Sequence, residues 1–412
     1  MHARAEPISA GRSHQRICPL NIDHSPTRDH GTSATKPSPV LPAFDQAKAP
    51  HRPIKIDGSL RETTARAGDV SVECQAGSSG GSSLSAVPAC IRQEASGHRK
   101  RPDQIKSRFM SAKLGGFAAA LHTPRREDGS IDFAALARNT DWVISQGASA
   151  VVPCGGTGEY SDLTLGQRKE IVDQLAWVPK AKAKLVVGVG SGSLRDSVDL
   201  ARHALDRGSD AVLLPPPHFY RYEARDLLPF FRAAARAIGG PTMLYNLAGF
   251  VSPLDAEIVA ELISTETHLI GIKDSSGGLE ILRRLTQAGI ASVRVQGHDA
   301  WLAESLRQGL ADAAISGPAS VVPEAIRAVF ETFGDEDAFS AAATHFEQFL
   351  QQLMRFPYPW VIKWAAQYRG LDPVTFAVPL SAERDQDRQA FLSWFETWLE
   401  NGPPTSPDFR RP

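Results

Sequence analysis

The chain alternates short apolar runs with helical patterns, and this alternation constrains its fold more than any other feature. Eight apolar runs follow one another, at 115–121, 149–154, 184–190, 210–216, 241–246, 268–273, 292–297 and 311–317. Segments with helical periodicity separate them, including 133–145, 167–177, 197–206, 224–238 and 280–287. Short apolar runs that alternate with helices indicate a parallel sheet buried on both faces.

Eight such units match the number and length of a (β/α)8 barrel. A doubly wound sheet is the competing architecture, but "GVGSGS" at 188–193 has the wrong spacing for a dinucleotide fingerprint. We therefore predict an α/β fold, a TIM barrel followed by a C-terminal helical appendage at 336–356, 358–369 and 383–400. Thr164 and Ser252 are the expected N-caps of two of the helices, Ser252 with a proline at the first helical position.

Aromatic residues are distributed unevenly, and this divides the chain. All seven tryptophans and all six tyrosines lie beyond residue 109, and the preceding part is rich in Ser, Pro, Gly, Arg and His. Such a composition cannot bury enough apolar surface to offset the entropy of ordering. We predict a disordered N-terminal extension over 1–109, a catalytic barrel over 110–335, a helical region over 336–402 and a flexible tail over 403–412. The working protein is expected to begin near Met110.

Charge and cysteine usage exclude several classes of function. Lys and Arg total 45 against 46 Asp and Glu, so no nucleic-acid or membrane-surface partner is expected. No segment approaches the roughly 18 consecutive apolar residues of a membrane span. The start of the chain lacks the apolar core of a secretory signal. The four cysteines have no CxxC or metal-like spacing, so we expect no metal site, no disulfide framework and a cytoplasmic location.

Lys273 is the strongest candidate for chemistry, because it ends the sixth apolar run. Active sites of such barrels are built at the carboxyl ends of the strands. An amine there is partly desolvated, which favours the neutral nucleophile that forms a Schiff base with a carbonyl compound. A buried ion pair with Asp274 or Glu159 is the alternative, and strand position alone does not separate the two readings.

Tyr245 ends the preceding run, so its hydroxyl and the Lys273 amine can converge on one small ligand. A phenol beside an iminium can serve as general acid and base, although a lone tyrosine is more often a core residue. The loop "GGTGE", 155–159, offers backbone N–H groups and the Thr157 hydroxyl to an anion, either a carboxylate or a phosphate. For Glu159 we favour a structural role in this loop.

Other candidates have a plainer interpretation. His218 and His298 lie in strand-end loops and are more often solvated than functional. Lys363 lies on a helical segment and is expected to be a surface lysine. Cys154 is interpreted as a small core residue, and the aromatic stripe at 391–398 as a packed helix face.

The motifs "GGTGE", "YN", "GIKDSSG", "GHDAWL" and "AISGPASVVPE", spread over about 114–400, resemble those of the dihydrodipicolinate synthase/N-acetylneuraminate lyase family. The resemblance implies a Schiff-base lyase or aldolase that acts on pyruvate or a longer 2-keto acid without metal or organic cofactor. It implies that Lys273 forms the iminium and that Tyr245 donates and accepts the proton. Gly156 and Thr157 would hold the keto-acid carboxylate, and the backbone around Ile315 would line the pocket. A homo-oligomer, tetramer or dimer, is also implied.

Two departures from the family pattern bear on the substrate. Synthases that make the lysine precursor carry an arginine where this chain has Phe250, and those synthases and the neuraminate lyases tend to carry a hydroxyl residue where it has Gly156. The "GGTGE" loop is instead similar to that of the keto-deoxy-glucarate dehydratase branch. We therefore favour aldol cleavage or dehydration of a 2-keto-3-deoxy acid, with Phe250, Tyr220 and His298 as candidates for a second-substrate pocket. The alternatives are 4-hydroxy-tetrahydrodipicolinate synthase activity on pyruvate and aspartate semialdehyde, and an inactive barrel that binds or regulates.

Overall fold

The computed structural model describes residues 114–176, 178, 183–373 and 375–402. The segments predicted to be disordered or flexible, 1–109 and 403–412, lie outside the described residues.

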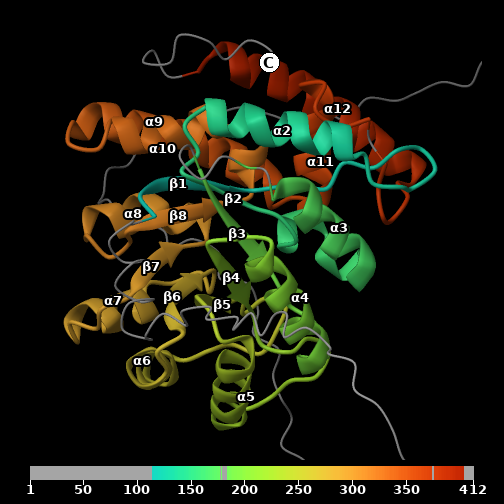
Figure 1. Cartoon of the computed structure of the whole chain (residues 1–412). Helices are drawn as coiled ribbons and strands as arrows, with labels where there is room; N and C mark the ends of the chain where they lie inside the picture. The colour runs from blue at the N-terminus through green and yellow to red at the C-terminus, as the bar shows by residue number, and fades with distance from the viewer. Residues whose placement is uncertain (1–113, 177, 179–182, 374, 403–412) are drawn as a thin grey trace, which may run out of the picture. The chain divides into compact units, whose positions relative to one another are not determined.

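Eight parallel strands form a closed barrel in which each strand pairs with the next along the chain and the last pairs with the first (Figure 1). The strands are β1 (Gly116–Ala120), β2 (Ala150–Val152), β3 (Lys184–Gly188), β4 (Ala211–Leu214), β5 (Thr242–Asn246), β6 (Leu269–Asp274), β7 (Val293–Gln296) and β8 (Ala313–Ser316). The predicted TIM barrel is confirmed.

Helices follow the strands and cover the barrel. They are α2 (Phe133–Ser145), α3 (Leu165–Leu175), α4 (Leu194–Asp206), α5 (Ala224–Ile238), α6 (Ala256–Thr265), α7 (Glu280–Gln287), α8 (Leu302–Arg307) and α9 (Pro323–Glu331). Three of the predicted ranges, 133–145, 224–238 and 280–287, coincide with α2, α5 and α7. Four 3-10 turns complete the loops: η1 (Gly156–Gly158), η2 (Tyr160–Asp162), η3 (Asp299–Trp301) and η4 (Pro318–Ser320).

One of the two predicted N-caps is right and the other is wrong. Thr164 caps α3, where its Oγ1 accepts the Gln167 N–H at 3.2 Å in a capping box. Ser252 does not begin a helix, because α6 starts at Ala256 and its cap is Asp255. The Ser252 hydroxyl instead accepts the Tyr222 N–H at 2.7 Å and so joins the loops after β4 and β5.

Three further helices form the C-terminal region: α10 (Glu336–Leu353), α11 (Tyr358–Tyr368) and α12 (Ala382–Glu400). In Figure 1 they lie beside α2 and α9, and α11 also contacts the η1 turn after β2. Phe391, Phe395 and Trp398 of α12 are buried, and Trp394 packs against them. The interpretation of this stripe as a packed helix face is confirmed.

The side chains on the two faces of the strands belong to two different hydrophobic clusters. One cluster of buried residues takes members from all eight strands, such as Ala118, Met243 and Val295, and fills the barrel interior. The residues between them, such as Phe117 and Leu244, pack against the helices.

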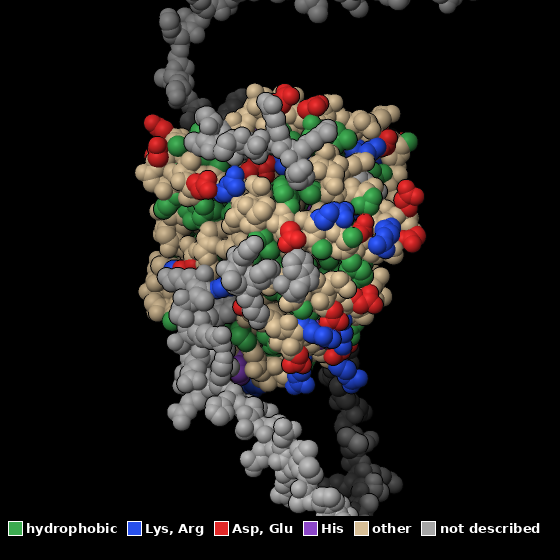
Figure 2. Space-filling view, turned by 45° about the horizontal axis from the view of Figure 1, so that its top comes forward, with side chains coloured by type: hydrophobic (Ala, Val, Ile, Leu, Met, Phe, Trp, Pro, Cys, Tyr) green, Lys and Arg blue, Asp and Glu red, His purple; other side chains and the backbone are tan. Residues whose placement is uncertain are grey.

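Acidic and basic side chains lie interspersed on the face that Figure 2 displays, and they form no large patch of one charge sign there. Within the described ranges, no helix combines the length and the apolar character needed to cross a bilayer.

Candidate active site

Lys273 and Tyr245 meet at the carboxyl ends of neighbouring strands. The register pairs Tyr245 of β5 with Lys273 of β6, and Lys273 Nζ lies 3.2 Å from Tyr245 Oη. The amine also lies 4.4 Å from the centre of the tyrosine ring. Both residues are buried, with exposed fractions of 6% and 5%. A hydroxyl is therefore within hydrogen-bond reach of an amine that is nearly removed from water.

A shift in the strand register turns Lys273 into the barrel. The pairing of β5 with β6 moves from Thr242–Leu269 to Met243–Gly271, so β6 has one extra residue at Ile270. Such a bulge reverses the alternation of side chains beyond it. Ile272 accordingly packs toward the helices, and Lys273 points inward to meet Tyr245.

Gly297, the residue after β7, leaves the space that the lysine chain occupies. A Cβ at this position would lie 2.7 Å from Lys273 Cε, closer than side-chain atoms approach one another. Glycine at position 297 thus leaves the space in which the Lys273 side chain lies.

Asp299 places a carboxyl group close enough to Lys273 to interact with it electrostatically. Burial raises the pKa of the Asp299 carboxyl to about 6, and a hydrogen bond with the Ser316 side chain and the Lys273 cation oppose that rise. Ser316 ends β8 and is fully buried. Near neutral pH this carboxyl can change its protonation state at little cost, which suits a group that exchanges a proton.

The described contacts do not pair Lys273 with Asp274 or Glu159, the two carboxylates of the alternative interpretation. Glu159 is paired with Lys363 at 2.8 Å, and Asp274 accepts the Asn246 side-chain N–H at 3.0 Å and the Ser276 N–H at 3.0 Å. Both carboxylates that the sequence offered to Lys273 thus have other partners.

The "GGTGE" loop forms the η1 turn, with a left-handed residue on each side. Cys154 has φ 57° and Glu159 has φ 52°, a conformation that non-glycine residues adopt mainly where the surrounding structure imposes it. The turn is closed by the N–H groups of Gly158 and Glu159, so the N–H groups of Gly156 and Thr157 stay outside it. Burial raises the pKa of the Cys154 thiol to about 11, which agrees with a core residue.

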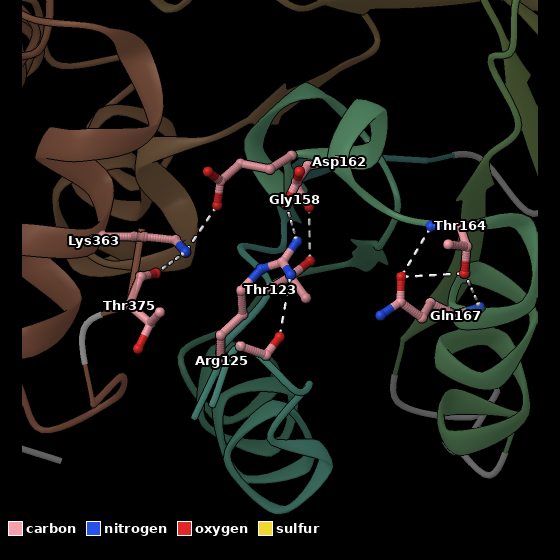
Figure 3. Close-up of polar contacts among 10 residues, drawn as sticks. Thr123, Arg125, Gly158, Asp162, Thr164, Gln167, Lys363 and Thr375 are labelled. Atoms are coloured by element: carbon pink, nitrogen blue, oxygen red, sulfur yellow. Dashed lines mark hydrogen bonds and ion pairs between the residues drawn. The ribbon is translucent and has the colours of Figure 1, made fainter. Parts of the chain in front are cut away.

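Three side chains from outside the loop fix it (Figure 3). Thr123 Oγ1 donates to the Gly158 carbonyl at 2.8 Å, and Arg125 Nη2 donates to Asp162 at 2.7 Å. Lys363 of α11 pairs with Glu159 and donates to the Thr375 carbonyl at 2.6 Å. The prediction of a surface lysine is wrong, because 1% of the Lys363 side chain is exposed. A structural role for Glu159 agrees with this ion pair.

A second phenol reaches the same loop. Tyr358, the first residue of α11, hydrogen-bonds the Thr157 side chain and lies within electrostatic range of Asp299 and Tyr245. Burial is the main cause that raises its pKa. Ile315, the predicted lining residue, is fully buried in the interior cluster on β8, one residue before Ser316.

The candidates for a second-substrate pocket lie on the rim. Phe250 and Tyr220 are 72% and 66% exposed, on the loops after β5 and β4. His298 is half-buried after β7, with its N–H bonded to Gln296 Oε1 at 2.9 Å. Burial lowers the pKa of His298 and also that of His218, which lies edge-on to Tyr160 at 5.9 Å between ring centres.

Two residues of this constellation, Asp299 and Tyr358, were missed in the sequence. Asp299 lies in the quoted motif "GHDAWL", three residues after β7 ends at Gln296, so its place at a strand end was a usable signal. Tyr358 had no comparable signal, because it lies on a helix beyond the eighth strand. Among the residues that the structure describes, no group of three or more His, Cys, Asp or Glu is arranged to hold a metal ion.

Comparisons with known proteins agree with this architecture. Residues 113–396 match the model of the "Dihydrodipicolinate synthetase family". The chain is 30% identical over 270 residues to a 4-hydroxy-tetrahydrodipicolinate synthase of Alcanivorax borkumensis, covering 65% of this chain and 92% of that protein. It is 31% identical over 279 residues to a protein of the same name from Methanothrix thermoacetophila, covering 66% and 92%.

Solved structures give the same result for the fold. The synthase from Methylacidiphilum fumariolicum SolV superposes with a TM-score of 0.64 at 26% identity, over 70% of this chain and 98% of that one. The N-acetylneuraminate lyase of Proteus mirabilis superposes with a TM-score of 0.61 at 24% identity, over 68% and 98%. At that identity the second likeness concerns the fold alone.

Proposed function

The chain belongs to the dihydrodipicolinate synthetase family and is a lyase of the aldolase type, and from that premise we propose that it forms a Schiff base between Lys273 and a 2-keto acid. The substrate is pyruvate or a 2-keto-3-deoxy acid. The product chemistry is aldol cleavage, aldol condensation or dehydration.

In this reaction Lys273 Nζ attacks the C2 carbonyl of the keto acid. The carbinolamine then loses water, and the imine that forms is protonated and withdraws electrons from C3. A proton or a carbon fragment can leave C3 because the iminium accepts the electron pair. The Tyr245 hydroxyl, 3.2 Å from the amine, donates and accepts the protons of these steps. Gly156 and Thr157 hold the substrate carboxylate, beside the backbone of Ile315.

The approach of Lys273 Nζ to Tyr245 Oη is the observation that carries the proposal. Its test is incubation with pyruvate and borohydride, followed by peptide mass spectrometry. We expect the mass of a reduced pyruvyl group on the peptide that contains Lys273, and none in the Lys273→Ala variant. An unmodified protein, or an adduct on another lysine, would refute the proposal and would favour an inactive barrel that binds small molecules.

The second substrate is the finer part of the proposal. Phe250 exposes an aromatic ring, not a cation, at the rim, which favours a keto-deoxy sugar acid over a partner with a second carboxylate. One observation favours the synthase reaction: Arg221 Nη1 donates to the carbonyl of Val251, the residue after Phe250, at 2.5 Å and so brings a guanidinium to this loop. Pyruvate release from a panel of 2-keto-3-deoxy acids, compared with condensation of pyruvate and aspartate semialdehyde, separates the two reactions.

We also propose that the protein is a cytoplasmic homo-oligomer, a dimer or tetramer. Phe219, Tyr220 and Phe250 expose 87%, 66% and 72% of their surface, and aromatic side chains of this kind are enriched at protein interfaces. Phe219 has φ 86° and lies edge-on to Tyr220 at 5.0 Å between ring centres. Light scattering during gel filtration tests the proposal, and a monomer at micromolar concentration would contradict it.

A further inference from the structure

Tyr358 lies over the backbone of Gly317, which directly follows β8. A Cβ on Gly317 would overlap Tyr358 Oη, and it would lie 2.7 Å from Thr157 Oγ1 and 2.9 Å from Tyr358 Cζ. The two hydroxyl oxygens therefore occupy the space above one backbone atom, and a hydrogen bond joins them. Only the missing side chain at position 317 leaves room for the phenol.

The loop that is to hold the carboxylate has few hydroxyl groups of its own. Gly156 contributes only backbone, so Thr157 supplies the side-chain hydroxyl, which has one proton and rotates freely without a partner. Burial raises the pKa of the Tyr358 phenol and Asp299 raises it further, against the effect of the Thr157 hydrogen bond, so the phenol keeps a proton that it can donate. When Tyr358 Oη donates to Thr157 Oγ1, the Thr157 proton remains available for a carboxylate oxygen.

We propose that Tyr358 is a positioning residue of the keto-acid pocket, whose hydroxyl directs the Thr157 hydroxyl toward the substrate carboxylate. This inference rests on the proposed function. The same helix also binds the other end of the loop, through the 2.8 Å ion pair between Lys363 and Glu159. Helix α11 thus fixes the carboxylate-binding loop at two points, and the C-terminal region is part of the active site.

The test is the pyruvate concentration at which borohydride trapping of Lys273 is half-maximal. In Tyr358→Phe we expect that concentration to rise about tenfold, because a misdirected hydroxyl loses most of one hydrogen bond to a charged group. The amount of adduct at saturating pyruvate should stay the same. Methyl pyruvate, which lacks the carboxylate charge, should show less than a twofold change.

Two further variants separate positioning from a general structural effect. Tyr368→Phe removes a phenol oxygen from the other end of α11 and should leave the pyruvate dependence unchanged. In a Thr157→Val background, Tyr358→Phe should have no additional effect, since the hydroxyl it directs is gone. An equal loss for pyruvate and methyl pyruvate would overturn the inference.

The outcomes also distinguish this inference from the proposed function. If the unaltered protein forms an adduct on Lys273 and Tyr358→Phe has the same pyruvate dependence, the inference fails and the proposed function stands. If the unaltered protein forms no adduct at any pyruvate concentration, the proposed function fails, and the role of Tyr358 with it.

Discussion

Lys273 combines a buried setting with partners that can accept and return a proton. Tyr245 contacts the amine directly, and Asp299 acts on it from the next strand end. Among the described contacts, the amine has a phenol as its hydrogen-bond partner and no carboxylate within ion-pair distance. This is the residue-level feature that favours covalent chemistry over a structural role.

Tyr245→Phe tests the role of the phenol. The variant keeps the ring beside Lys273 and removes only the oxygen. Exchange of the pyruvate methyl protons with deuterated water, followed by NMR, should slow about a hundredfold or more, because general acid–base groups typically contribute that much. Borohydride should still trap pyruvate on Lys273. Exchange at the unaltered rate would show that another group moves the proton.

At the scale of elements, α11 connects the C-terminal region to the barrel mouth. Tyr358 at its start and Lys363 in its middle both reach the loop between β2 and α3. The loop has strained residues at each end, and such conformations persist only where neighbouring structure fixes them. The ion pair of Lys363 with Glu159 is one of those fixing contacts.

Lys363→Met tests the ion pair. The variant keeps the length of the side chain and leaves the Glu159 carboxylate buried without its cation. We expect the free energy of unfolding in urea to fall by about 3 kcal/mol, as for other buried pairs that lose one member. Adding Glu159→Gln should restore part of this loss. A change below about 1 kcal/mol in the single variant would contradict a buried, tightly coupled pair.

At the scale of the whole folded region, two buried histidines lie between packed elements, one beside the barrel and one between the C-terminal helices α10 and α12. His122, just after β1, lies 3.2 Å from the Asn139 amide of α2, and that amide donates to the Leu371 carbonyl at 2.9 Å. Burial, and then the Lys363 charge, lowers the pKa of His122 to about 3. His345 of α10 stacks on Trp398 at 4.2 Å, and burial lowers its pKa to about 4.

From the lowered pKa values of these two histidines we predict that the free energy of unfolding falls in mild acid. Both pKa values lie below the ordinary value, so the unfolded chain takes up protons first as the pH falls below about 6.5. Each histidine then lowers the free energy of unfolding by up to about 1.4 kcal/mol per pH unit, until the pH reaches the pKa of that histidine in the folded protein. Asp299 opposes this between about pH 6 and 4, because its raised pKa favours the folded state as it protonates.

Urea unfolding at pH 7.5, 6.0 and 5.0 measures the effect. We expect the midpoint to fall at each step, and to fall less in His122→Asn, which has one histidine fewer to protonate. Equal midpoints at pH 7.5 and 5.0 would contradict buried neutral histidines.

Much of the site could be predicted from particular residues. The end of the sixth apolar run located Lys273, and the fifth run located Tyr245. Consecutive strands of a closed parallel barrel are neighbours, so two strand-end residues had to be adjacent. Helix boundaries were predicted less well: Ser252 with its following proline resembles an N-cap, but the N-cap of α6 is Asp255, three residues later. The cytoplasmic location and the disorder of 1–109 stay predictions.

The sequence by itself determined the barrel, the lysine and its tyrosine, because periodicity and strand order act over short distances along the chain. Only the tertiary structure decided that Tyr358 lies over Gly317 and that Lys363 is buried against Glu159. Lys363 and Glu159 lie some 200 positions apart in the chain, and so do Tyr358 and its hydrogen-bond partner Thr157. A helix that follows the last strand and packs back on the barrel mouth brings them together. No local pattern records where such a helix docks, since its position depends on how whole elements fill space together.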